Sequence, residues 1–343
     1  MKKVQDIGEF RLIERIRRFL PSTPTVVEGV GDDCAVIRVY DHLMLVSCDL
    51  SIEGVHFRRD LAKPEDIGWK VAAASLSDVA AMGGTPLFCL TSLSVPGDTP
   101  VLFVERLYQG ITNLLSRFGA VVIGGDTTRT NGAISLDITV IGEVTGHRFL
   151  RRRGAQIGDK LTATGRLGRS RCGLHALLNG HSAPALTESH MRPKPRVLEG
   201  LWLSTRPGIH AMLDVSDGLV QDAGHLARAS GLGIDIDPDK LPLAPEHEEY
   251  CAAHGLDSVT MALQGGEDYE LLFAMDSEKC EETLAAFHQE FRTPITMIGE
   301  FTDAWSDVRI RGEKPAIEGY DHFSPTFAAP PGKGTAESTG AEE

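Results

Sequence analysis

Apolar residues along this chain follow two periods, one typical of helices and the other of strands. Helical spacing runs over residues 9–20, and Pro21 ends it. Two further helices are expected, one opened by Pro64, which suits a first helical turn, and one over residues 99–118. Apolar runs predict strands at about 33–39, 43–48, 86–95, 120–123 and 134–144. The run at 120–123 is wholly apolar, which predicts a short buried strand that ends before Gly124.

The same patterns continue beyond the basic cluster Arg151-Arg152-Arg153, which with Gly154 indicates a domain boundary. We expect strands at 159–164, before Asp214, around Leu272, and at about 294–300 and 307–311, with helices from about Ser170, over 219–230 and over 277–290. The first half mixes strands and helices without strict alternation, which indicates an α+β domain at 1–148. Residues 149–325 are expected to form an α/β domain, and residues 326–343 a disordered tail because of their composition.

Composition excludes several classes of protein. The chain has 34 basic and 48 acidic residues, a formal charge of −14, which argues against a nucleic-acid-binding protein. No apolar run approaches the roughly 18 residues of a membrane span. None of the six cysteines forms a C-x-x-C pair and no signal peptide precedes them, so a reduced, cytoplasmic protein is expected.

Acidic residues recur in contexts rich in glycine, serine or apolar residues, mostly at the ends of predicted elements. They occur in Gly31-Asp32-Asp33, Ser47-Cys48-Asp49, Leu76-Ser77-Asp78, Gly124-Gly125-Asp126, Asp214-Val215-Ser216-Asp217 and Gly265-Gly266-Glu267-Asp268. One such group alone indicates a turn or a helix cap. Because buried carboxylates are costly without a cation, the recurrence favours a single site that holds hard cations and the phosphates they carry.

Three local features have a simpler structural interpretation beside a functional one. The segment Gly165–Ser170 could cradle a phosphate at a helix start, yet it lacks the Walker A spacing and a plain turn is favoured. Ser216 or Asp217 could be a helix cap. Cys34 and Cys48 adjoin acids of interest, although buried thiols are usually inert packing residues.

These motifs together resemble the thiamine-monophosphate kinases. The resemblance is carried by Gly31–Ala35, Glu53–Phe57, Leu76–Gly83, Ile123–Arg129, Asp214–Leu219, Gly265–Leu271 and Gly319–Phe323, in order over about residues 5–324. It implies an N-terminal α+β domain that dimerises into a β-barrel and a C-terminal α/β domain, with ATP and Mg²⁺ between them. The implied reaction is ATP plus thiamine monophosphate giving ADP plus thiamine diphosphate.

The resemblance also implies a role for each matching residue. The implied metal ligands are Asp33, Ser47, Cys48, Asp49, Asp78, Asp126, Asp214 and Asp217, the implied nucleotide contacts are Gly125, Asp126, Arg152 and Ser216, the implied acceptor contacts are His56, Glu267 and Tyr320, and Asp126, Asp217 and Arg152 are the implied catalytic residues. Cys48 replaces the usual threonine, so that only its backbone carbonyl is an expected ligand. Ser75 stands where asparagine is common.

Several alternatives stay open at this point. The sequence does not select among Arg151, Arg152 and Arg153 for the nucleotide contact, and a solvated linker charge is the simpler interpretation of any one of them. His56 and Tyr320 have structural alternatives as core residues. Two other functions remain: another ATP-dependent enzyme of the same superfamily, acting on a different phosphate or amide, and a non-catalytic Mg²⁺–nucleotide sensor. Residues 1–30 lack the cysteine that selenophosphate synthetases need, and the C-terminus lacks that of the hydrogenase maturation factor.

Overall fold

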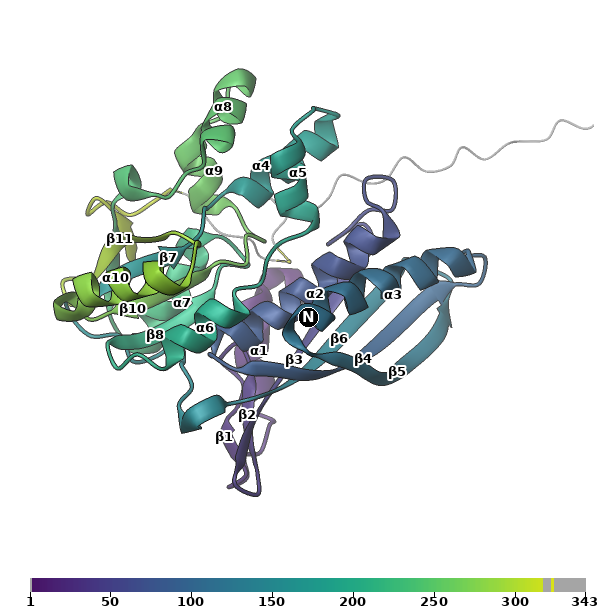
Figure 1. Ribbon diagram of the computed structural model, residues 1–343, viewed down its shortest axis with the longest axis horizontal. Coiled ribbons are helices and arrows are strands. Elements are labelled where there is room, and N and C mark those ends of the chain that lie inside the picture. Colours follow the sequence, from purple (N-terminus) through teal and green to yellow (C-terminus); the bar gives the residue numbers. More distant parts are fainter. Residues whose placement is uncertain (1, 317–321, 324–343) are drawn as a thin grey trace, which may run out of the picture. The chain divides into compact units, whose positions relative to one another are not determined.

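The computed structural model describes residues 2–316, 322 and 323. The chain divides into two compact units, residues 20–320 and residues 1–19 with 321–343. In the second of these, α1 (Glu9–Arg17) is the helix that the apolar spacing over residues 9–20 predicts. All the other helices and strands named below belong to the larger unit (Figure 1).

The first half of the larger unit forms a six-stranded sheet in the order β1-β2-β3-β6-β4-β5. Its strands are β1 (Val26–Glu28), β2 (Ala35–Val39), β3 (His42–Ile52), β4 (Thr85–Pro96), β5 (Val121–Thr130) and β6 (Ser135–Glu143). Neighbouring strands are antiparallel except for β4 and β5, which α3 (Val101–Leu115) connects in parallel. Helices α2 (Pro64–Ala81) and α3 pack together beside this sheet (Figure 1).

The second half forms another six-stranded sheet in the order β12-β9-β11-β7-β10-β8. The strands are β7 (Lys160–Thr164), β8 (Ile209–Asp214), β9 (Gly233–Ile236), β10 (Leu271–Met275), β11 (Ile295–Thr302) and β12 (Val308–Ile310). The helices are α4 (Arg169–Asn179), α5 (Pro184–Met191), α6 (Val197–Ser204), α7 (Leu219–Ser230), α8 (Pro245–His254), α9 (Ser258–Gln264) and α10 (Cys280–Glu290). Only β9 and β12 pair in parallel among these described strands.

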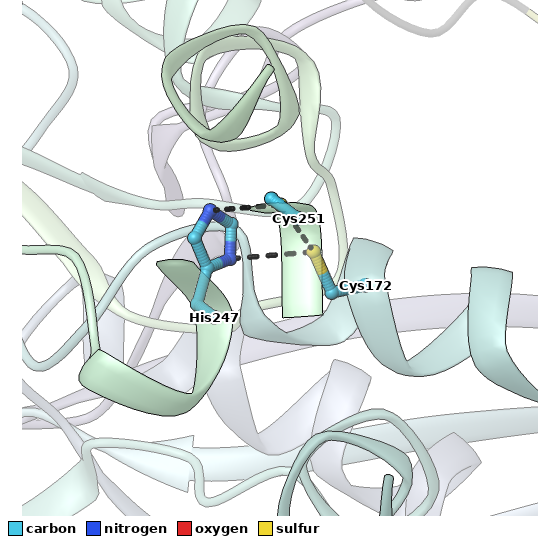
Figure 2. Close-up of side chains that lie close together, drawn as sticks. All are labelled: Cys172, His247 and Cys251. Carbon is cyan, nitrogen blue, oxygen red and sulfur yellow. Dashed lines mark hydrogen bonds between the residues drawn. The ribbon is translucent and has the colours of Figure 1, made fainter. Parts of the chain in front are cut away.

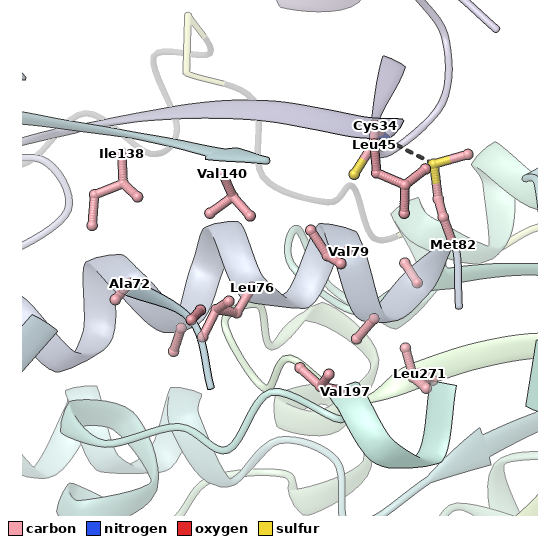
Figure 3. Close-up of a cluster of buried hydrophobic side chains, with 14 of the residues drawn as sticks. Cys34, Leu45, Ala72, Leu76, Val79, Met82, Ile138, Val140, Val197 and Leu271 are labelled. Carbon is pink, nitrogen blue, oxygen red and sulfur yellow. Dashed lines mark hydrogen bonds between the residues drawn. The ribbon is translucent and has the colours of Figure 1, made fainter. Parts of the chain in front are cut away.

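Helix α2 is buried around nearly its whole circumference, as its alanines and serines allow. Ala72, Ala73 and Ala80 are wholly inaccessible to solvent. Figure 3 shows the reason, since strand residues such as Ile138 lie on one side of the helix and Val197 and Leu271 lie on the other. A helix that is buried all round belongs to the core. Asp78, near the C-terminal end of α2, is therefore held beside β3, where Ser47 donates to it.

The prediction for residues 120–123 was wrong in length and in burial. Strand β5 continues through Gly124-Gly125-Asp126-Thr127 to Thr130, and Val121 and Ile123 are more than half exposed. It lies at the edge of the sheet, where an apolar run has a free face. Glycine is required at position 125 because φ is +154° and a Cβ would lie 1.8 Å from the Thr91 carbonyl oxygen.

Candidate functional site

Three acids from distant parts of the chain converge. Asp33 precedes β2, Asp78 lies in the last turn of α2, and Asp214 ends β8. One carboxylate oxygen of each lies within 4.8 Å of the others. Asp33 and Asp214 are buried and Asp78 is half-buried. Strand ends and a core helix thus bring together three of the acids that the sequence singles out.

Burial and mutual repulsion make this acid group electrostatically unfavourable by itself. Burial, and then the Asp33 carboxylate, raises the pKa of Asp214 to about 7. Burial together with Asp49 and Asp214 raises the pKa of Asp78 well above its ordinary value. Hydroxyl groups offset part of this cost, since Ser47 donates to Asp78 and Ser77 donates to Asp214 Oδ2 at 2.6 Å.

The two carboxylate oxygens of Asp33 differ in their partners. Its Oδ1 accepts hydrogen bonds from Arg152 Nε at 3.0 Å and from an Arg152 terminal nitrogen at 2.5 Å. Its Oδ2 is buried, and no described residue donates a hydrogen bond to it. A buried, oxygen-only set of ligands with one oxygen unpartnered suits a hard divalent cation such as Mg²⁺. The residues present therefore fit the metal that the sequence analysis expects.

The structure distinguishes between the three adjacent arginines. Arg151 and Arg153 both pair with Glu28, at 2.7 Å in each case. Arg152 alone turns to the acid group, where its side chain binds Asp33 and its backbone N–H donates to Asp32 at 3.2 Å. Although burial opposes the charge, Asp33 raises the pKa of Arg152, so the guanidinium stays protonated.

Asp222 organises the loop before α7, and the sequence analysis missed it. Its Oδ2 accepts from the backbone N–H groups of Ser216, Asp217 and Gly218, at 3.0–3.1 Å. Asp217, Asp222 and His225 also lie within 4.8 Å of one another through their ligand atoms. The acid–x–Ser–acid motif is thus shaped by a fourth polar residue one turn into the helix. The sequence signal that could have identified Asp222 is its position four residues after Gly218, in the first turn of the predicted helix.

A second polar group, also missed in part, surrounds Glu267. The Glu267 carboxylate binds the buried Lys70 ammonium at 2.8 Å, and Lys70 lies 3.1 Å from His190 Nε2. Lys70 also donates to the His56 carbonyl oxygen at 3.3 Å. Burial alone raises the pKa of Glu267, but the Lys70 ammonium outweighs it and lowers the pKa below its ordinary value. Burial and the adjacent Lys70 lower the pKa of His190 to about 3, so this imidazole is neutral.

The loop that carries Glu267 has an unusual backbone. Glu267 has a φ of +62° and Tyr269 a φ of +52°. The loop is held in place because the Glu267 N–H donates to the Ser216 carbonyl oxygen at 2.8 Å. Left-handed backbone at non-glycine residues is uncommon and often accompanies functional sites. The motif that contains Ser216 and the motif that contains Glu267 are therefore directly joined.

Other predicted residues are not members of the group formed by Asp33, Asp78 and Asp214, although Asp49 is near enough to raise the pKa of Asp78. The Cys48 thiol points to Asp137 on the exposed side of β3, at 2.9 Å, which leaves its backbone carbonyl as the predicted ligand. Asp126 is exposed on β5, beside Gly125. Asp49 is half-buried, and burial raises its pKa. Tyr320 lies outside the described residues.

The loop Gly165–Ser170 is a turn, as favoured from its sequence. Its backbone N–H groups at Gly168 and Ser170 both donate to the Asp268 carboxylate, at 2.5 and 3.0 Å. A protein carboxylate thus occupies the place of a phosphate at the start of α4.

None of the described helices is long and apolar enough to span a membrane.

Comparison with known proteins divides the chain into the same two halves. Residues 31–144 match the family described as AIR synthase related protein, N-terminal domain, and residues 156–311 match its C-terminal domain. A curated thiamine-monophosphate kinase from Aquifex aeolicus is 36% identical over 326 residues, which cover 94% of this chain and 100% of that protein. Its counterpart from Bacillus subtilis is 34% identical and covers 92% of this chain and 100% of that protein.

Solved structures are similar over nearly the whole chain. The structure of AaThiL complexed with AMPPCP and TMP has a TM-score of 0.84 at 35% identity, covering 94% of this chain and 99% of that chain. The hydrogenase maturation protein HypE in complex with ATP has a TM-score of 0.67 at 18% identity, covering 93% of this chain and 96% of that chain. The second similarity concerns the fold alone.

Proposed function

The chain belongs to the thiamine-monophosphate kinases of the AIR synthase-related family, and we propose that it transfers the γ-phosphoryl group of ATP to thiamine monophosphate, yielding ADP and thiamine diphosphate. Similarity at this level over the full length of the relatives supports the same reaction in this chain. The predicted two-domain architecture is confirmed, with helices and a mixed six-stranded sheet in each half. The described strands form no closed barrel within one chain, and the second sheet is mostly antiparallel. The family matches end at 144 and resume at 156, which supports a boundary near 148.

The observation that carries the proposal is the convergence of Asp33, Asp78 and Asp214 with an unpartnered Asp33 oxygen. Acids in this arrangement would hold Mg²⁺, which supplies charge neutralisation for two phosphate groups that approach each other. The proposed ligand set is completed by Ser47, Asp49, Asp126, Asp217 and the Cys48 carbonyl. Their placement in the matching motifs supports this assignment.

The proposed nucleotide contacts are Gly125, Asp126, Arg152 and Ser216. Arg152 is suited to the transferring phosphoryl group because it is charged, partly exposed and already held beside the acids. A fixed guanidinium stabilises developing negative charge without rearranging during the reaction. Asp126 and Asp217 are proposed as further catalytic residues.

The proposed acceptor contacts are His56, Glu267 and Tyr320. Glu267 is ionised and fixed by Lys70, so that it can accept hydrogen bonds from the acceptor's aminopyrimidine. His56 lies close by, since its carbonyl oxygen binds the same Lys70. Tyr320 is retained on its motif alone.

The acceptor phosphate is itself the nucleophile in this proposal. It is ionised at neutral pH and needs no strong general base, and the proposed catalytic residues are two acids, Asp126 and Asp217, and Arg152. We therefore expect direct transfer. A phosphoprotein formed from γ-labelled ATP at a rate competent for turnover would contradict this.

The decisive experiment incubates the purified protein with ATP, Mg²⁺ and thiamine monophosphate and separates the products by chromatography. ADP and thiamine diphosphate should appear in equal amounts, and neither should form when EDTA is present or when thiamine replaces the monophosphate. Nucleotide binding without either product would favour the alternative of a Mg²⁺–nucleotide sensor. ATP hydrolysis without thiamine diphosphate would favour another enzyme of the superfamily.

Assembly as a cytoplasmic homodimer is part of the proposal. On the N-terminal sheet, Leu50, Phe88, Val121 and Ile123 are all at least 40% exposed, and Phe88 and Val121 are register partners. Val121 and Ile123 lie on the edge strand β5, and exposed apolar residues on a sheet face and its edge strand are typical of a protein interface. All six cysteines are free, in keeping with a reduced compartment.

A further inference from the structure

Two cysteines and a histidine meet in the core of the C-terminal half, away from every residue assigned above (Figure 2). Cys172 Sγ lies 3.5 Å from Cys251 Sγ and 3.4 Å from His247 Nδ1, and Cys251 Sγ lies 3.9 Å from His247 Nε2. All three side chains are at most 1% exposed. Their position follows from two helices that contact each other, α4 with Cys172 and α8 with the other two residues.

The local structure aims a histidine lone pair into this group. His247 and Cys251 are four residues apart on α8, so both project from one face of the helix. His247 Nε2 lies 2.9 Å from the Ser258 carbonyl oxygen, which can only accept, so this nitrogen carries the proton. Nδ1 is then unprotonated and faces Cys172. Second-shell hydrogen bonds of this kind fix the tautomer of metal-binding histidines.

We propose that Cys172, His247 and Cys251 form a binding site for a zinc-like divalent cation. Binding replaces two thiol protons: Zn²⁺ and two S–H groups give two Zn–S bonds and release two protons to solvent. The product carries no net charge, because two thiolates balance the dication. A neutral complex suits the surrounding apolar cluster, which includes Ala176, Leu186 and Met261.

Two of the three separations between ligand atoms fit the coordination sphere of zinc. Cys251 Sγ lies 3.9 Å from His247 Nε2, on the protonated side of the ring, and must turn toward Nδ1 to complete the set. Zn–S bonds are about 2.3 Å and Zn–N bonds about 2.0–2.1 Å. With the observed separations of 3.5 Å between sulfurs and 3.4 Å from Cys172 Sγ to Nδ1, the angles at the ion would be roughly 100°. Such angles are close to tetrahedral, so small side-chain rotations are enough to bring the third ligand into place.

The ion would act as a clamp between α4 and α8. The start of α4 bears Ser170, whose hydroxyl lies 2.9 Å from His190 Nδ1, and His190 contacts Lys70 beside Glu267. A metal that fixes α4 therefore supports the wall of the proposed acceptor site without contacting the acceptor. The support of the acceptor site rests on the proposed function. Metal binding does not, because it is measured without substrate.

The test uses Co²⁺ as a spectroscopic probe of the reduced full-length protein, with Mg²⁺ in excess to occupy the acid group. Co²⁺ should bind at one equivalent, with thiolate charge-transfer absorption in the near ultraviolet and intense visible bands of a tetrahedral ion, and Zn²⁺ should displace it. The variants C172S and C251S should each lose this absorption, with an affinity loss beyond the roughly 10–100-fold typical of second-shell changes. C280S is the matched control, since Cys280 is buried on α10 and outside the group.

Circular dichroism and kinase assays with Mg²⁺ establish that each variant is folded. Zn²⁺ should raise the melting temperature of the wild type and of C280S, and leave that of C172S unchanged. Absence of charge-transfer absorption in the wild type would overturn the proposal. So would its persistence in C172S/C251S, or a Cys172–Cys251 disulfide that forms in the presence of Zn²⁺. A wild-type protein that binds Co²⁺ but shows no kinase activity with Mg²⁺ would instead count against the proposed function and leave the metal site standing.

Discussion

At the scale of single residues, burial and neighbouring acids make the ionised form of some carboxyl groups unfavourable in the absence of a bound cation. Asp214 is the clearest case, since its pKa of about 7 reflects burial and the neighbouring Asp33. A carboxyl group whose pKa is raised on folding favours the folded state at low pH. Its contribution is lost as the pH rises from about 4 through about 7, and a bound cation restores it.

Asp214→Asn should therefore separate stability from activity. In EDTA at pH 8 the variant should unfold with a free energy about 1–3 kcal/mol higher than the wild type, because one pKa unit corresponds to about 1.4 kcal/mol. Its amide oxygen still accepts from Ser77. Urea unfolding between pH 4 and pH 8 checks the difference, and kinase activity at saturating Mg²⁺ should be nearly abolished. A variant less stable than the wild type in EDTA would mean that the acids do not repel one another.

Glu267 is a residue-scale test of acceptor recognition. Glu267→Gln removes a charged acceptor worth about 1.5–3 kcal/mol, so the Michaelis constant for thiamine monophosphate should rise roughly 10–150-fold while that for ATP changes little. Lys70 would also lose its counter-charge, which lowers stability.

The double variant Lys70→Met with Glu267→Gln distinguishes recognition from folding. It removes both charges, so the melting temperature should recover toward that of the wild type while the Michaelis constant for the acceptor stays high. Recovery of both quantities would assign Glu267 a structural role. An effect of Glu267→Gln on ATP alone would mean that the two ends of the site are assigned the wrong way round.

At the scale of elements, the loops between strands and helices position the site. The Ser216–Gly218 loop is closed by Asp222, which lies in the first turn of α7 and accepts three backbone N–H groups. Burial raises the Asp222 pKa well above its ordinary value. An uncharged acceptor in the same place should therefore preserve most of the loop.

Asp222→Ala should leave three N–H groups without their acceptor and lower the free energy of unfolding by about 1–3 kcal/mol. It should also raise the Michaelis constant for ATP, because Ser216 belongs to the proposed nucleotide contacts. Asp222→Asn should lose less than half as much on both measures. Equal losses in the two variants would show that the charge, and not the acceptor, holds the loop.

At the scale of the whole molecule, the exposed apolar side of the N-terminal sheet is the proposed dimer interface. Ile123 on β5 is 55% exposed, and a lysine there would place a charge within the proposed dimer interface. Ile123→Lys should give a monomer by light scattering at micromolar concentration, where the wild type gives a dimer. The matched control is Leu198→Lys on α6, which is 59% exposed and lies outside the patch. A wild-type monomer would contradict dimerisation.

One prediction was revised and one open choice was narrowed once the whole chain was in view. The edge position of β5 exposes residues that their apolar run had indicated as buried. Among the three arginines only Arg152 faces the acids, because Glu28 holds the other two. Neither outcome depends on local sequence, since each is set by a neighbour more than 30 residues away.

The sequence by itself determined the long elements and the chemistry of the motifs. Apolar periodicity placed α1 and β6, Pro64 marked the start of α2, and the Asp214 motif preceded α7, because these signals are carried by residues close together in the sequence. The acids at element ends predicted a cation site because few other arrangements tolerate buried carboxylates. The short elements β1, β9 and α9 were missed because so few residues carry little periodicity, and α8 was missed because its mostly polar sequence has no apolar stripe.

Only the tertiary structure decided which side chains meet. Lys70 reaches Glu267, Asp222 closes the Ser216 loop, and Cys172 joins His247 and Cys251 across 75 to 79 positions. Such pairings depend on how sheets and helices stack, which a pattern in one segment does not encode. The physical reason is that secondary structure follows local backbone and side-chain preferences, whereas a site assembles from the ends of elements that packing alone brings together.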